Sequence, residues 1–198
     1  MRDQNVRSDY FETSEAEDVV GSLRHLKLCL AETRTDPQAW KWVVLSLFSA
    51  VQGSIVCHAS GSAQIECLTK DSAMKMLAWL NDRTDAKANA PEEKLAGPST
   101  LFKRLNGTYT DFPPSGGIIA TDQATELSFS RVVGLRHDFS HFSPKGWAIE
   151  KTMITEAIPD LLKLILNIYS SGYAFRHLDN CTEVPTLISE LLGSLGNP

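Results

Sequence analysis

The sequence predicts an all-α protein, an up-and-down four-helix bundle with short extra helices and an inserted polar loop. Apolar residues recur at spacings of three and four in four long segments, which is the periodicity of helices with one buried face. No segment shows the strict alternation of apolar and polar residues that is typical of strands. The chain has 198 residues, 42% of them hydrophobic, so it is large enough for one domain with a substantial core.

The first long helix follows a polar segment, residues 1–13, which we expect to be flexible; residues 14–198 are predicted to form a single domain. Ser14 and Glu17 have the spacing of a capping box, in which the two side chains satisfy free amides at a helix start. The helix then carries one apolar stripe, which consists of Val19, Leu23, Leu26 and Leu30.

The second long helix is predicted to begin at Asp36 and Pro37, because an aspartate cap followed by proline favours a helix start. Its apolar face, residues 40–55, is wide, so we place this helix at the centre of the core. Residues 69–81 predict a shorter helix. The polar residues 82–99 are interpreted as a loop inserted into the domain.

The third long helix follows a short one near residues 101–105. Thr121 or Asp122 can cap it, and Pro144 is expected to stop it. Its predicted apolar residues are Leu127, Val132, Val133, Leu135 and Phe139.

The fourth long helix has the most regular apolar spacing. Pro159 is placed in its first turn, and Ser171-Gly172 is expected to end it. A small closing helix is predicted over 185–195. The apolar residues of the fourth helix are Ile158, Leu161, Leu162, Leu164, Ile165 and Ile168.

The overall charge limits the kind of nucleic-acid binding that the chain can perform. There are 19 Lys and Arg against 24 Asp and Glu, a net charge of −5. A protein that coats nucleic acid through a broad basic face is usually strongly basic, so the composition argues against that class and leaves room for a small basic site.

The cysteines and the apolar runs indicate a cytoplasmic protein without a membrane segment. None of the four cysteines forms a Cys-x-x-Cys pair, so we expect reduced thiols rather than a zinc knuckle or a disulfide framework. The N-terminus lacks the apolar stretch of a secretory signal. The longest uninterrupted apolar runs fall well short of the roughly 20 residues that cross a bilayer.

One segment at the end of the third long helix has a composition unlike that of a core. Arg136, His137, Asp138 and His141 lie within six residues. A guanidinium is a permanent planar cation that matches two phosphate oxygens, and an imidazole can take or give a proton near neutral pH. Together they can cleave RNA without a metal: a base removes the 2′-hydroxyl proton, the oxygen attacks phosphorus, and the cation stabilises the developing charge.

The run Arg136-His137-Asp138-Phe139-Ser140-His141 resembles the Arg-x(4–6)-His motif of the HEPN superfamily, including the polar residue directly after the arginine. The wider run through Glu150 resembles HEPN proteins of bacterial toxin and defence loci, and the resemblance covers about positions 131–165. Many HEPN proteins are metal-independent endoribonucleases, and many are toxins paired with an antitoxin protein. They are typically four-helix bundles whose dimers line one cleft with two motifs.

The resemblance implies a homodimeric endoribonuclease without a cofactor, acting on RNA as a toxin or defence effector and leaving a 2′,3′-cyclic phosphate. Arg136 and His141 would be catalytic, with His141 as general base, and His137 would support them. Flanking basic residues could attract phosphate; these are Arg131, Lys145 and Lys151. The same resemblance allows a different class of function, a non-catalytic module that binds a nucleotide or a protein partner.

Helix geometry leaves two further points open. Five residues along an ideal helix rotate by about 500°, which leaves Arg136 and His141 about 140° apart. We expect a fraying helix end together with a dimer to bring such groups into one cleft; a long arginine side chain that reaches around the helix is an alternative. His137 and His141 share a face at i and i+4, as in His-Glu-x-x-His zinc sites. A zinc hydrolase with Glu150 or Glu156 as third ligand is therefore an alternative.

Overall fold

The computed structural model describes residues 11–82, 89–141, 146 and 148–195, and this part of the chain is all-helical. Besides helices it contains one isolated antiparallel bridge, between Leu68 and Leu95. The helices in chain order are α1 (Glu15–Glu32), α2 (Ala39–Ala59), the 3-10 helix η1 (Ile65–Cys67), α3 (Lys70–Asn81), α4 (Pro98–Leu105), α5 (Gln123–Ser140), α6 (Lys151–Ser170) and α7 (Glu183–Leu195).

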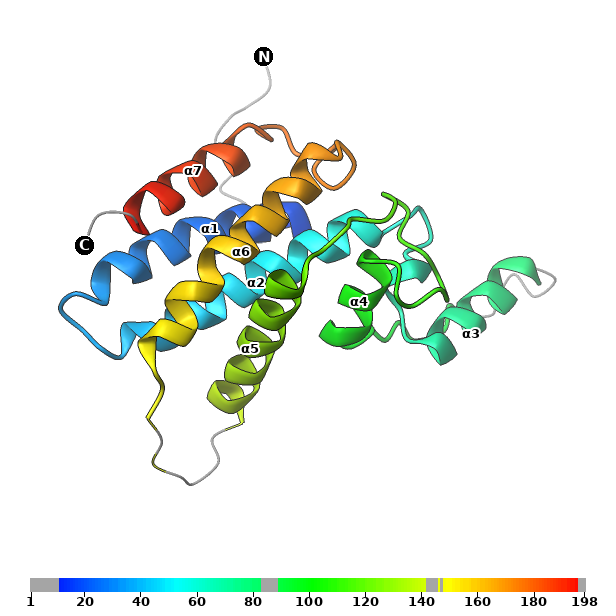
Figure 1. The fold of residues 1–198 in the computed structure, drawn as a ribbon. Coiled ribbons are helices and arrows are strands. Elements are labelled where there is room, and N and C mark those ends of the chain that lie inside the picture. The colour runs from blue at the N-terminus through cyan, green and yellow to red at the C-terminus, as the bar shows by residue number, and fades with distance from the viewer. Residues whose placement is uncertain (1–10, 83–88, 142–145, 147, 196–198) are drawn as a thin grey trace, which may run out of the picture.

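Helix α2 lies at the centre of the fold, as its wide apolar face predicts (Figure 1). It packs against α1, α4, α5 and α6, and α7 covers α1 and α6 from the outside. Apolar side chains from all these helices form one main core. Burial of this core is the main favourable contribution to the stability of the fold.

The starts of α1 and α5 are confirmed, but the capping box at Ser14 forms only in part, because the Glu17 carboxylate contacts the Ser14 hydroxyl and not an amide. The Ser14 hydroxyl accepts a hydrogen bond from the Glu17 amide and donates one to the Glu17 carboxylate. Asp122 caps α5 by accepting from the Thr125 amide at 2.8 Å. These side chains replace the partners that the first amides of a helix lack, so the helix starts could be predicted from the sequence.

Three details of the helix predictions are wrong. Pro159 lies inside α6 rather than in its first turn, because α6 begins at Lys151. Leu127, expected in the core, is 51% exposed, whereas Phe129 is buried. Helix α2 begins at Ala39, after a turn in which Asp36 accepts a hydrogen bond from the Gln38 amide.

The small helix α3 stands apart from the main core and projects from one side of the molecule (Figure 1). Its buried residues Ala73 and Met76 pack with Leu68 in a separate hydrophobic cluster. Arg104 of α4 anchors this part, because its fully buried guanidinium donates to the carbonyl oxygens of Glu66 and Leu68. The segment predicted as an inserted loop adjoins this cluster through the Leu95 bridge; residues 83–88 lie outside the described residues.

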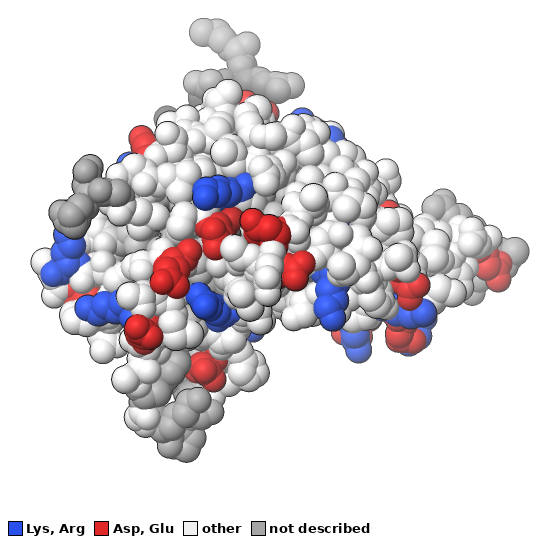
Figure 2. Space-filling model, viewed as in Figure 1, with Lys and Arg blue, Asp and Glu red and all other residues white. Residues whose placement is uncertain are grey.

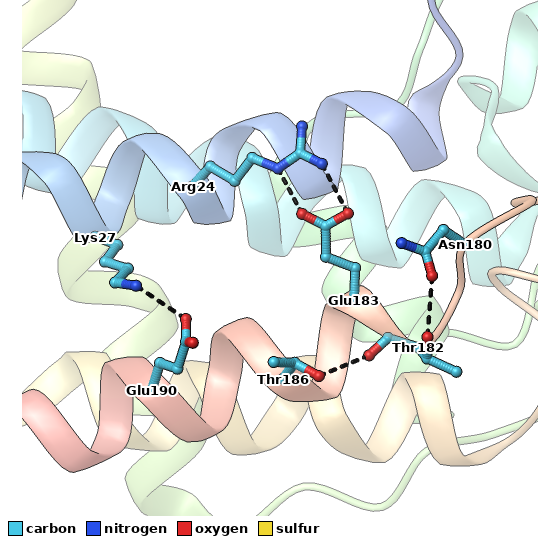
Figure 3. Close-up of polar contacts among 7 residues, drawn as sticks. All are labelled: Arg24, Lys27, Asn180, Thr182, Glu183, Thr186 and Glu190. Atoms are coloured by element: carbon cyan, nitrogen blue, oxygen red, sulfur yellow. Dashed lines mark hydrogen bonds and ion pairs between the residues drawn. The ribbon is translucent and has the colours of Figure 1, made fainter.

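Helix α7 docks on α1 through two ion pairs, which Figure 3 shows side by side. Arg24 donates two hydrogen bonds to the Glu183 carboxylate, and Lys27 contacts Glu190 at 3.0 Å. Arg24 also holds the pKa of the Glu183 carboxyl below its usual range. The buried side of α7 supplies Val184 and other apolar residues to the core, so the closing helix completes the main body of the fold.

Helix α2 is long and apolar enough to cross a membrane by length and composition alone. In this fold, 72% of its most apolar window is buried against other helices. A core helix passes the same test of length and composition, so the test does not separate the two environments.

The end of α2 is fastened to two other segments by a buried histidine. His58 is fully buried, its Nε2 lies 2.8 Å from the Gly117 carbonyl oxygen, and its Nδ1 lies 3.2 Å from the Ser171 hydroxyl. Since a carbonyl oxygen only accepts, Nε2 carries the proton in this contact. The imidazole thereby joins α2 to the loop before α5 and to the end of α6.

This histidine makes the stability of the protein depend on pH. Burial lowers the pKa of His58, so the folded protein keeps the ring neutral where the unfolded chain protonates it. The free energy of unfolding therefore has its full value above about pH 6.5, the pKa of an ordinary histidine, and decreases as the pH falls below that value. Urea unfolding at pH 7.5 and pH 5.5 should show a lower midpoint at pH 5.5. A smaller difference is expected for His58→Gln; equal midpoints in the wild type would contradict the assignment.

Candidate functional site

The residues singled out by the sequence lie at the C-terminal end of α5. The helix ends at Ser140, and His141 is its C-cap, with an amide that donates to the His137 carbonyl at 3.0 Å. His141 and His137 are both exposed, whereas Arg136 is half-buried. The helix end thus presents two imidazoles to solvent and directs the guanidinium toward the protein.

The two histidines lie against each other. Their ring centroids are 4.4 Å apart, with an angle of 46° between the ring planes. Positions i and i+4 differ by only about 40° around a helix, so the pairing follows directly from the spacing in the sequence. The two imidazoles therefore form an adjacent pair at the end of the helix.

Arg136 points in a different direction, toward α2. Its guanidinium lies over the ring of Phe48, 5.0 Å from the centroid. An arginine above an aromatic face is held by attraction to the ring quadrupole and keeps its in-plane N–H groups available. The guanidinium of Arg136 makes no hydrogen bond or ion pair with another residue of the described part of the chain.

Arg136 lines a pocket of about 620 Å³ between the start of α1, the middle of α2 and α5. The pocket is mixed in character: Phe48 and other apolar groups form part of its wall, and carboxylates stand at the start of α1. One buried polar atom, Oε1 of Gln52, has no hydrogen-bond partner. The lining residues are Thr13, Ser14, Glu15, Asp18, Phe48, Ser49, Gln52, Gly53, Val56, Leu95 and Arg136.

The structure therefore brings His137 and His141 together but directs Arg136 to the other side of α5. The described residues that line the pocket include Arg136 and neither histidine. The cause is the helical rotation of about 140° between positions 136 and 141, which the single turn at His141 does not remove. Within one chain, the guanidinium of Arg136 lines the pocket, whereas the imidazoles of His137 and His141 lie outside it.

The expected basic rim is only partly available for binding phosphate. Arg131 contacts the Glu156 carboxylate at 3.4 Å. Lys151 is exposed at the first position of α6, and Lys145 lies outside the described residues. Figure 2 shows acidic side chains gathered near the middle of one face, with basic side chains spread around them. Phosphate binding would thus depend on local groups such as Arg136.

The described residues supply two of the three ligands that a catalytic zinc ion uses. They contain no group of three His, Cys, Asp or Glu side chains that could hold a metal ion. Neither Glu150 nor Glu156 completes a three-ligand set with the histidine pair among these residues.

The four cysteines are buried or half-buried thiols. All four are free, as expected. Burial raises the pKa of Cys57 to about 12, so its thiol stays protonated at neutral pH and is a poor nucleophile.

The α2 residues that line the pocket beside Arg136 are not recognisable from the sequence. Phe48 and Gln52 belong to a run that has the spacing of a core helix, and Phe48 is indeed 6% exposed. The sequence feature that could have indicated this pocket is Gln52, a polar residue inside an apolar helix. Its position next to Arg136 follows only from the packing of α5 across α2.

No protein-family model matches the chain, and the searches of curated proteins and of solved structures find no match either.

Proposed function

We propose that the chain is a metal-independent endoribonuclease that leaves 2′,3′-cyclic phosphate and 5′-hydroxyl ends. His141 acts as general base on the 2′-hydroxyl, His137 orients it, and Arg136 holds the scissile phosphate. The observation that carries the proposal is the exposed imidazole pair at the end of α5, next to an arginine that has no ionic partner among the described residues. The resemblance to the HEPN motif covers the same residues.

The direction of Arg136 makes a dimer part of the proposal. The guanidinium and the imidazoles of one chain lie on different sides of α5, so a composite cleft takes phosphate-binding and proton-transfer groups from two copies. The four long helices α1, α2, α5 and α6 pack on one another in a way that is compatible with a HEPN-like up-and-down bundle. In this proposal the protein acts in the cytoplasm as a toxin or defence effector, and an antitoxin protein restrains it.

Cleavage in a chelator tests the proposal directly. Purified protein incubated with single-stranded RNA in EDTA should produce fragments, because none of the proposed steps uses a metal ion. The fragments should resist 3′-end ligation until the cyclic phosphate is removed. Intact RNA at high protein concentration would contradict the proposed function, and 3′-hydroxyl products would contradict the proposed mechanism.

A second candidate function is a non-catalytic module that binds a nucleotide or a protein partner. The pocket beside Arg136 favours it, because a pocket of about 620 Å³ whose wall includes a guanidinium can bind a phosphate group of a nucleotide without the histidines. A nucleotide that binds only the folded state would raise the melting temperature of the wild type but not of Arg136→Ala. His141→Ala should keep this response, which separates the module from the nuclease.

A further inference from the structure

We propose that His137 and His141 bind a transition-metal ion, Zn²⁺ above all, and that the bound ion inhibits the ribonuclease. The metal site follows from the geometry of the pair alone. The inhibition rests, in addition, on the function proposed above.

The two imidazoles are free to act as ligands. Both rings are exposed, and neither makes a hydrogen bond or ion pair with another described residue. A ligating histidine must offer an unprotonated nitrogen, and no hydrogen bond from another described residue occupies a nitrogen of either ring. The buried His58, by contrast, uses both nitrogens in contacts within the fold.

The distance between the rings suits one metal ion. Zinc–nitrogen bonds are about 2.0–2.1 Å, so two nitrogens on one ion stand roughly 3 Å apart. Rings with centroids 4.4 Å apart on successive turns reach this arrangement by side-chain rotation. The helix backbone holds both ligands in place, so the second imidazole binds within the same molecule and adds strongly to the affinity of the first.

The position on the helix also favours a cation. His141 is the C-cap of α5 and His137 lies in its last turn. The C-terminal end of a helix carries a partial negative charge from carbonyl groups without intrahelical partners. A divalent ion held by the pair would lie at this end, where the helix dipole stabilises positive charge.

Two nitrogen ligands leave the other coordination positions to water, since the described residues supply no third ligand. Imidazole favours Zn²⁺, Ni²⁺ and Cu²⁺, whereas Mg²⁺ prefers oxygen ligands, so the site should discriminate between them. A metal ion on His141 occupies the lone pair that would accept the 2′-hydroxyl proton. Occupation of the site therefore removes the general base and stops cleavage.

Calorimetric titration of the purified protein with Zn²⁺ or Ni²⁺, in buffer without chelator, tests the site itself. We expect saturable binding in the wild type and in the matched control His177→Ala, which removes an exposed histidine elsewhere. His137→Ala and His141→Ala should each weaken binding at least about tenfold, because each loses the second ligand. Mg²⁺ should not bind. Unchanged affinity in both single variants would overturn the site.

Cleavage assays separate this inference from the proposed function. Zn²⁺ should inhibit the wild type, EDTA should restore activity, and any residual activity of His137→Ala should resist inhibition at the same Zn²⁺ concentration. Cleavage that persists at saturating Zn²⁺ would overturn the inhibition. Binding that depends on both histidines in a protein that cleaves no RNA would confirm the metal site and reject the nuclease.

Discussion

His141→Ala is expected to lower the rate of RNA cleavage by about 100-fold or more, which is the usual loss when a general base is removed. The side chain is exposed at the C-cap of α5, and its ring lies against that of His137. The fold should therefore tolerate the change, and the melting temperature should stay close to that of the wild type. Single-turnover rates at saturating protein measure the effect on chemistry rather than on RNA binding.

Arg136→Ala should cause a loss of similar size, about 100- to 1000-fold, if the guanidinium stabilises the phosphate in the transition state. Arg136→Lys should restore little of it, because an ammonium group cannot make the paired hydrogen bonds of a guanidinium. The two copies of a dimer offer a sharper test. A mixture of Arg136→Ala and His141→Ala should regain part of the activity if one cleft takes groups from both copies.

The matched control for this series is His177→Ala, since His177 is exposed and lies in the turn after α6. Its cleavage rate should equal that of the wild type. If His141→Ala cleaves as fast as this control, His141 is not the base. If Arg136→Ala cleaves at the wild-type rate and loses only nucleotide binding, the pocket beside Phe48 belongs to a binding module instead.

The helices could be predicted because their caps and apolar periods are local features. Ser14 and Asp122 mark helix starts by side-chain hydrogen bonds to amides a few residues away. The exposed Leu127 shows where local information fails. A stripe through Phe129 and Val132 fits the same sequence as well as one through Leu127, and only packing against α2 and α6 selects the buried face.

The candidate site could be predicted in part for the same reason. The contact between His137 and His141 follows from their spacing on one helix. The surroundings of Arg136 could not be predicted, because Phe48 comes from a distant helix and meets the guanidinium only through the crossing of α2 and α5. The pairing of Arg131 with Glu156 is also a tertiary contact, and it reduces the basic rim that the sequence suggests.

Gly116→Ala is expected to lower the free energy of unfolding by about 3 kcal/mol or more. A Cβ at this position would lie 2.4 Å from Cε1 of His58, 2.5 Å from its Nδ1 and 2.7 Å from its carbonyl oxygen. The imidazole cannot move aside, because Gly117 and Ser171 hold both its nitrogens. The Gly116 amide also donates to the His58 carbonyl, so a shift of the loop breaks that hydrogen bond.

Gly134→Ala is the matched control for this substitution. A Cβ at Gly134 meets no described atom within 4 Å, and the residue lies inside α5, where alanine is favoured over glycine by about 0.5–1 kcal/mol. Urea unfolding at pH 7.5 should therefore show a lower midpoint for Gly116→Ala and a slightly higher one for Gly134→Ala. Equal midpoints for the two variants would mean that the loop before α5 is not fixed to α2 by His58. In that case the decrease in stability at acid pH should disappear as well, since both effects depend on the same enclosed imidazole.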